Sequence, residues 1–137
     1  MQERLESLRL DKILEIRSWA GLSPMPGTTG IIITNDKKIY YYHKYHHVPE
    51  NLKDKISLED ISEGRIIDND IYSILVNYLK ENIIGKEFEN VITRDAGFRV
   101  SGTINNNSFN INNLDIYNDL KRIINSKEKP SNRLFLI

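Results

Sequence analysis

Three histidines and a glutamate in the middle of the chain have the spacing of metal ligands. The positions i, i+3, i+4 and i+7 are held by His43, His46, His47 and Glu50, which on a helix would place four possible zinc ligands on one face. The local sequence favours a strand, because three tyrosines precede His43 and a proline soon interrupts the run. A strand rises about 3.3 Å per residue, so His43 and His47 would lie about 13 Å apart, with His46 on the other face. We therefore expect no metal site, and nothing in the sequence indicates a cofactor.

Acid–base catalysis by His43 would need a carboxylate within hydrogen-bond reach. The candidates are Asp36, Glu50 and Asp95, but nothing in the sequence brings one of them to the histidine. The chain has no G-x-S-x-G pattern, and its glycine-rich segment 21–30 lacks the Gly-Lys-Ser/Thr ending of a phosphate-binding loop. A small metal-independent hydrolase or nuclease that uses His43 with a carboxylate therefore stays an alternative to a protein without catalytic activity.

Length and composition indicate one globular domain over residues 1–137. Lys and Arg together number 19, as do Asp and Glu, and this zero net charge disfavours a protein built to hold nucleic acid. The absence of cysteine excludes disulfides and thiolate metal sites. No apolar run is long enough to span a membrane and no signal peptide is visible, so we expect a cytoplasmic protein.

The first half of the chain reads mainly as strands. Residues 1–11 fit either a helical turn or a period-two pattern, and a strand follows from Ile13 to the only tryptophan, Trp19. The loop 20–30 has two prolines and three glycines, which exclude a helix or a central strand. A hairpin follows at 31–45 with its turn at 35–38, and Ser57 is expected to start a short helix that ends at Gly64.

The second half contains the two main helices. The periodic residues Ile71, Ile74, Leu75, Tyr78 and Leu79 predict a helix over 69–84, with Asp68 as its N-cap and Gly85 after its end. Strands are expected at 88–94 and 98–105, with turns at 95–97 and 105–107. The polar side chains of the second strand, from Arg99 to Asn105, should face away from the core. A second helix is expected at 114–125, followed by an apolar terminal segment at 134–137 that pairs as an edge strand or packs on the core. The predicted fold class is α+β: an antiparallel sheet of hairpins with two main helices packed on one face.

Three surface features favour recognition of another protein. Tyr41 and Tyr45 alternate with Tyr40 and Tyr42, so one pair should belong to the core and the other to an exposed aromatic stripe. The loop 20–30 carries apolar side chains where exposure is expected, and the run 59–70 is acidic. The predicted partner-binding residues are Trp19, Leu22, Met25, Tyr41, His43, Tyr45, Glu59, Asp60 and Glu63.

In size and layout the chain resembles small cytosolic bacterial immunity proteins, which neutralise a toxin by covering its active site. The segment 16–21 and the order of strands and helices after it also look like the emfourin type of protease inhibitor, although Trp19-Ala20 replaces that family's paired glycines. These resemblances imply an inhibitor without catalytic activity, whose partner is another protein and neither nucleic acid nor a membrane. An accessory or structural subunit is a further alternative, and the oligomeric state is left open.

Overall fold

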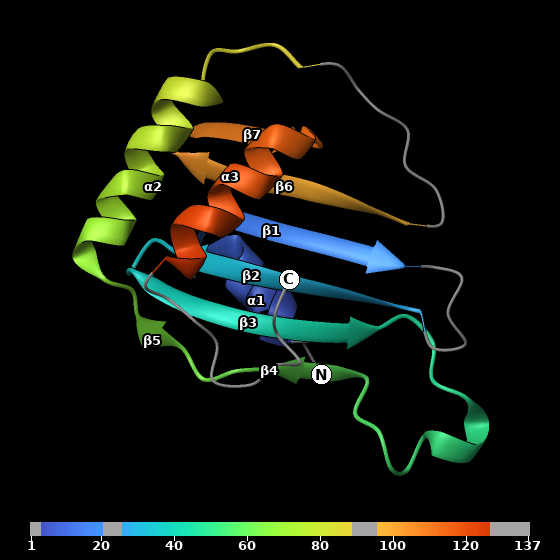
Figure 1. Ribbon diagram of the computed structural model, residues 1–137. Helices are drawn as coiled ribbons and strands as arrows, with labels where there is room; N and C mark the ends of the chain where they lie inside the picture. The colour runs from blue at the N-terminus through green and yellow to red at the C-terminus, as the bar shows by residue number, and fades with distance from the viewer. Residues whose placement is uncertain (1–3, 21–25, 89–95, 127–137) are drawn as a thin grey trace.

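The computed structural model describes residues 4–20, 26–88 and 96–126, which form one antiparallel sheet with helices on both faces (Figure 1). The strand order is β4-β3-β2-β1-β6-β7, with the short β5 also paired to β3. The strands are β1 (Lys12–Ala20), β2 (Gly27–Thr34), β3 (Lys38–Tyr45), β4 (Glu59–Ile61), β5 (Arg65–Ile66), β6 (Ala96–Ile104) and β7 (Asn107–Ile111). The helices are α1 (Arg4–Leu10), α2 (Asn69–Asn82), α3 (Leu114–Asn125) and the 3₁₀ turn η1 (Glu50–Leu52).

Helices α2 and α3 pack side by side on one face of the sheet, which confirms the predicted α+β class. Their buried leucines and isoleucines meet the side chains of Ile16, Ile33 and Val100 in the main core. The carboxylate of Asp68 accepts hydrogen bonds from two backbone amides of the first turn of α2, as an N-cap does. Gly85 adopts a φ of 78° just after the helix, as predicted. Ile74, which was expected to face the core, is 49% exposed, because it lies at the edge of the apolar stripe.

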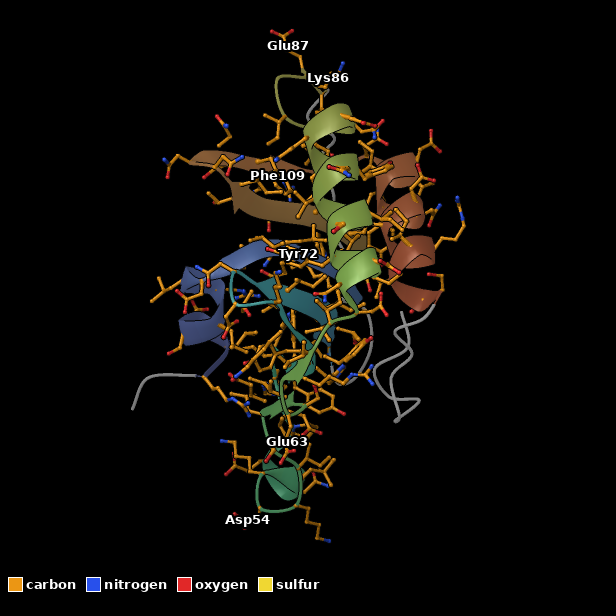
Figure 2. The ribbon with its side chains drawn as sticks, turned by 90° about the vertical axis from the view of Figure 1, so that its left-hand side faces the viewer. Asp54, Glu63, Tyr72, Lys86, Glu87 and Phe109 are labelled. Carbon is orange, nitrogen blue, oxygen red and sulfur yellow. The ribbon has the colours of Figure 1, made fainter. Side chains whose placement is uncertain are left out.

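Helix α1 covers the opposite face of the sheet, and the sequence did not predict it (Figure 2). Leu5 is buried there against Ile32 and Tyr42 in a second, smaller core. Because β3 has helices on both faces, the adjacent tyrosines Tyr41 and Tyr42 are 3% and 0% exposed. The expectation that one set of tyrosines forms the core and the other an exposed stripe is therefore wrong for these two residues.

Two further segments differ from the prediction. The segment 27–30 belongs to β2, a central strand, so the predicted loop was too long. Its glycines do not break the strand, because they lie opposite large side chains of β3: a Cβ atom on Gly30 would stand 2.5 Å from the ring of Tyr42. The predicted helix from Ser57 to Gly64 is also wrong, since β4 occupies this segment and satisfies its backbone by pairing with β3.

The predicted turns at 35–38 and 105–107 are confirmed, whereas the turn predicted at 95–97 is wrong for Ala96 and Gly97, which pair with β1 as the start of β6. In the turn after β2, Lys37 adopts a positive φ of 62°, and the turn between β6 and β7 places Asn105 and Asn106 at 50° and 66°. Of the predicted strand at 88–94 only Phe88 is described, and it packs against the main core outside any strand. The terminal segment 134–137 lies outside the described residues.

Candidate interaction surface

Alternation along β1 places Glu15, Arg17 and Trp19 on the face of the sheet that α1 partly covers. Their direct partners on β6 are Ser101, Arg99 and Gly97, respectively. The side chains of these cross-strand partners share the same face, because paired residues of an antiparallel ladder point the same way. This face therefore carries a row of charged residues beside the only tryptophan of the chain.

Glu15 is fully buried and holds an ion-pair network at the border of α1. Its carboxylate accepts hydrogen bonds from Arg9 at 2.9 to 3.2 Å, from Lys12 at 2.9 Å and from the hydroxyl of Tyr42 at 2.5 Å. Burial by itself would raise the pKa of this carboxyl group. The hydrogen bonds from Arg9 and Tyr42 and the positive charge of Lys12 outweigh burial and lower its pKa to about 2.

This network joins α1 to the sheet. Arg9 belongs to α1, and its guanidinium also pairs with Glu6 of the same helix at 3.0 Å. Lys12 extends the network toward β6, since its ammonium group lies 2.9 Å from Oγ of Ser101. A carboxylate with a pKa of about 2 carries no proton near neutral pH, so it is unsuited to general acid catalysis. We interpret the Glu15 network as structural: its ion pairs and hydrogen bonds hold α1 against the sheet.

Beyond α1 the same face is open and basic. Arg17 and Arg99 are directly opposite each other on β1 and β6, and both are partly exposed. The Nε atom of Arg17 is buried and has no hydrogen-bond partner within residues 4–20, 26–88 and 96–126. Arg99 donates to the side-chain oxygen of Asn110 at 3.0 Å. Figure 2 shows α1 beside the lower strands on this side of the sheet, while α2 and α3 lie on the other side.

A shallow groove of about 410 Å³ runs along this open part of the sheet. Its polar lining comes from β1, β6 and β7: Lys12, Arg17, Ser101, Thr103, Ser108 and Asn110. We call the open face formed by these residues with Trp19 and Arg99 the arginine face. It offers cations, hydroxyl groups and an amide, and it has no carboxylate in its lining.

His43, the residue of the alternative catalytic hypothesis, lies on the other face of the sheet, at the far end of β3. Nδ1 of His43 lies 2.7 Å from Oγ1 of Thr29, and the ring of Tyr45 meets the imidazole edge to face at 4.5 Å. Burial lowers the pKa of His43; the charge of Asp60 opposes this effect and that of His46 adds to it. Among the described side chains no hydrogen bond joins His43 to Asp60, although the two residues are paired between β3 and β4. Among the described residues, His43 therefore has no carboxylate hydrogen-bonded to its imidazole that would orient it as a general base.

Two of the three candidate carboxylates for His43 are engaged elsewhere. Asp36 accepts a hydrogen bond from Thr34 at the opposite end of β3, and Glu50 forms an ion pair with Lys53 at 2.7 Å. Asp95 lies outside the described residues. His46 is bound to the hydroxyl of Thr28 at 2.7 Å, away from His43 along the chain. In the part of the chain that the structure describes, no three His, Asp or Glu side chains are grouped so as to hold a metal ion.

The structure divides the predicted partner-binding residues between different surfaces. Trp19 lies on the arginine face, whereas Tyr41, His43 and Tyr45 point to the side of α2 and α3, where Tyr41 is buried and so unavailable to a partner. Leu22 and Met25 lie outside the described residues.

The acidic residues of the predicted set lie at the other edge of the sheet. Glu59 accepts a hydrogen bond from the backbone amide of Leu5 at 3.0 Å, which ties β4 to α1. Asp60 and Glu63 are exposed, and Figure 2 places Glu63 near the η1 end of the molecule, far from β7. The acidic run therefore forms no continuous surface with Trp19.

Sequence reasoning missed Arg17 as a surface residue, although a signal was present. Arg99, Ser101 and Thr103 alternate with apolar residues and were expected to face away from the core. Arg17 alternates in the same way with Ile16 and precedes Trp19 by two positions. The register between β1 and β6 brings the two arginines together. This register depends on pairing between segments that are far apart in the chain, so it could not be predicted from one sequence.

No protein-family model, curated protein or solved structure matches the chain. No helix of the described residues is long and apolar enough to cross a membrane.

Proposed function

We propose that this chain is a protein-binding protein without catalytic activity, most similar in role to an immunity protein that inhibits a toxin or enzyme by covering its functional surface. The observation that carries the proposal is the arginine face, where Trp19 lies beside Arg17 and Arg99 on a rigid sheet. Tryptophan and arginine are the residue types most enriched among the energetic hot spots of protein interfaces. In keeping with the resemblance to immunity proteins, we expect it to act in the bacterial cytoplasm.

The state of the polar side chains supports binding over catalysis. The fully buried carboxylate of Glu15 is saturated by Arg9, Lys12 and Tyr42, and its pKa of about 2 removes it from proton transfer near neutral pH. His43 and His46 each bind a threonine hydroxyl. A preorganised sheet surface loses little conformational entropy when it binds, which favours tight association.

Co-purification with the product of a neighbouring gene tests this proposal. We expect a stable complex whose affinity, measured by calorimetry, falls by about 30-fold in Trp19→Ala, since truncating a hot-spot residue costs about 2 kcal/mol. The matched control is Leu114→Ala, which removes an apolar side chain that is 55% exposed at the start of α3, on the other side of the sheet. This control should leave the affinity unchanged.

Two results would contradict the proposal. The first is turnover of a substrate by the isolated protein that disappears in His43→Ala, which would establish the hydrolase alternative. The second is a stable homo-oligomer that binds no other protein, which would favour a structural subunit.

A further inference from the structure

We propose that Arg17 and Arg99 form a carboxylate-binding site on the arginine face, and that it receives an acidic segment of the protein partner. This inference rests on the proposed function for the identity of the partner, but the site itself can be tested on the isolated chain. In this proposal Arg17 and Arg99 are the residues of the arginine face that recognise charge, and the partner must present carboxylates.

Two like charges lie directly opposite each other at this site. Arg17 and Arg99 are direct cross-strand partners, an arrangement that destabilises a sheet because the two positive charges repel each other. Within the residues that the structure describes, no carboxylate forms an ion pair with either of them. A bound carboxylate would remove this repulsion, so the free protein is less stable than the occupied one.

The neighbouring Glu15 network differs from this pair, because its cations are neutralised. Two residues earlier on the same face of β1, Glu15 neutralises Arg9 and Lys12 at distances of 2.9 Å. Arg9 of α1 is therefore paired with a carboxylate, whereas Arg17 of β1 has no ion pair among the described residues. The buried Nε atom of Arg17 has lost its contact with water without gaining a described partner, which leaves a donor that an incoming acceptor could satisfy.

The shape and chemistry of the groove also suit a carboxylate. A guanidinium presents a planar fork of donors that matches a carboxylate. Arg17 lines the groove, and Arg99 lies directly opposite Arg17 on β6. Ser101 and Thr103 of β6 and Ser108 of β7 supply hydroxyl groups along the groove. Trp19 adds apolar surface next to the charged site, because its cross-strand partner is Gly97, which has no side chain to cover it.

Acidic protein is favoured over nucleic acid as the occupant. Binding along a phosphate backbone requires several unneutralised cations in a row. Arg9 and Lys12, the other cations at this end of the face, are already paired with Glu15, and the chain has no net positive charge. Two guanidinium groups without a described ion pair, of which Arg99 is hydrogen-bonded only to the neutral side chain of Asn110, suit one or two carboxylates.

The test follows the arginine Nε–H resonances of the isolated, ¹⁵N-labelled protein during titration with a hexaglutamate peptide. We expect the signals of Arg17 and Arg99 to shift with saturation, while those of Arg122 on α3 do not. Arg17→Gln and Arg99→Gln should each weaken peptide binding by at least about tenfold. Arg17→Lys should weaken it similarly, because lysine keeps the charge but lacks the fork. Arg122→Gln, which removes an exposed cation from the other face, is the matched control.

A second measurement separates a binding site from a structural pair. Arg99→Gln relieves the like-charge repulsion, so it should raise the Tm of the free protein by about 2 °C while it weakens peptide binding. A lower Tm combined with unchanged peptide binding would overturn the proposal. It would also be overturned if an oligothymidylate of equal charge shifted the same resonances at lower concentration than the peptide.

The partner distinguishes this inference from the proposed function. If the partner binds both arginine variants as tightly as it binds the wild-type protein, docking of an acidic partner segment at Arg17 and Arg99 is refuted and the protein-binding function stands. If the peptide binds at Arg17 and Arg99 but no protein partner is found, the site stands and the proposed function fails.

Discussion

The hydroxyl of Tyr42 lies 2.5 Å from Oε2 of Glu15, and both side chains are 0% exposed. The two residues belong to β3 and β1, which are not neighbours, because β2 lies between them. Their contact crosses β2 at Gly30, the direct partner of both Tyr42 and Arg17. One glycine in the middle strand therefore allows a phenol to reach a carboxylate two strands away, and several stability predictions depend on this contact.

Replacing Tyr42 by phenylalanine should destabilise the protein by about 2 kcal/mol, since it removes a hydrogen bond to a buried carboxylate without changing the ring. The free energy of unfolding in urea measures this loss. Tyr45→Phe is the matched control, because the described structure gives its hydroxyl no hydrogen bond, and its effect should stay within about 0.5 kcal/mol. Equal stability of the two variants would show that Tyr42 does not bind Glu15.

Gly30→Ala should destabilise the protein by about 1–3 kcal/mol, because the new Cβ atom would stand 2.5 Å from the ring of Tyr42 in a packed core. Gly85→Ala provides a comparison at a position with open space, where only the positive φ of 78° opposes alanine at a cost of about 1 kcal/mol. Unfolding in urea gives both values. In a Tyr42→Ala background the cost of Gly30→Ala should largely disappear, and persistence of the full cost there would refute the clash.

The Glu15 network should make the free energy of unfolding depend on pH in the acid range. The folded state holds the pKa of Glu15 at about 2, below its ordinary value of 4.5, so the carboxylate contributes its stabilisation above pH 4.5 and loses it as the pH falls to 2. The shift corresponds to about 3 kcal/mol. Urea unfolding at a series of pH values measures it, with Glu15→Gln as the reference. This variant should be less stable near neutral pH and lose less between pH 4.5 and 2; parallel pH profiles would be the contrary result.

His43 should titrate below its ordinary pKa of 6.5, since burial disfavours its charged form. The unfolded chain takes up this proton at a higher pH than the folded chain, so the folded state loses stability as the pH falls below 6.5. An NMR titration of the imidazole C–H signals measures the pKa directly. His43→Gln should remove this part of the pH dependence, and a measured pKa at or above 6.5 would contradict the burial.

The sequence predicted those parts of the fold that depend on local periodicity. The helix over 114–125, the N-cap at Asp68 and the turn at Asn105 and Asn106 all follow from signals within a few residues. The predictions failed where a long-range partner decides the outcome. Gly30 lies in a central strand because Tyr42 fills the space beside it, and Glu59 joins a strand because β3 offers a free edge.

The candidate surface was only partly predictable for the same reason. Trp19 was selected by its residue type, and the polar alternation around Arg99 indicated a face turned away from the core. The covering of Tyr42 by α1 and the pairing of Arg17 with Arg99 depend on contacts between segments that are far apart in the sequence.

The pairing of β1 with β6 also has a consequence for folding during translation. Contacts such as that between Lys12 and Ser101 join residues 89 positions apart, so the centre of the sheet closes late. Until β6 has been synthesised, one edge of β1 has no partner strand. The side chains of Leu14 and Ile16, which β1 contributes to the core, lie next to this edge. Such a topology folds slowly, and its nascent chain is vulnerable to aggregation during translation. The yield of native protein should therefore respond to the speed of translation and to chaperones that protect exposed strands.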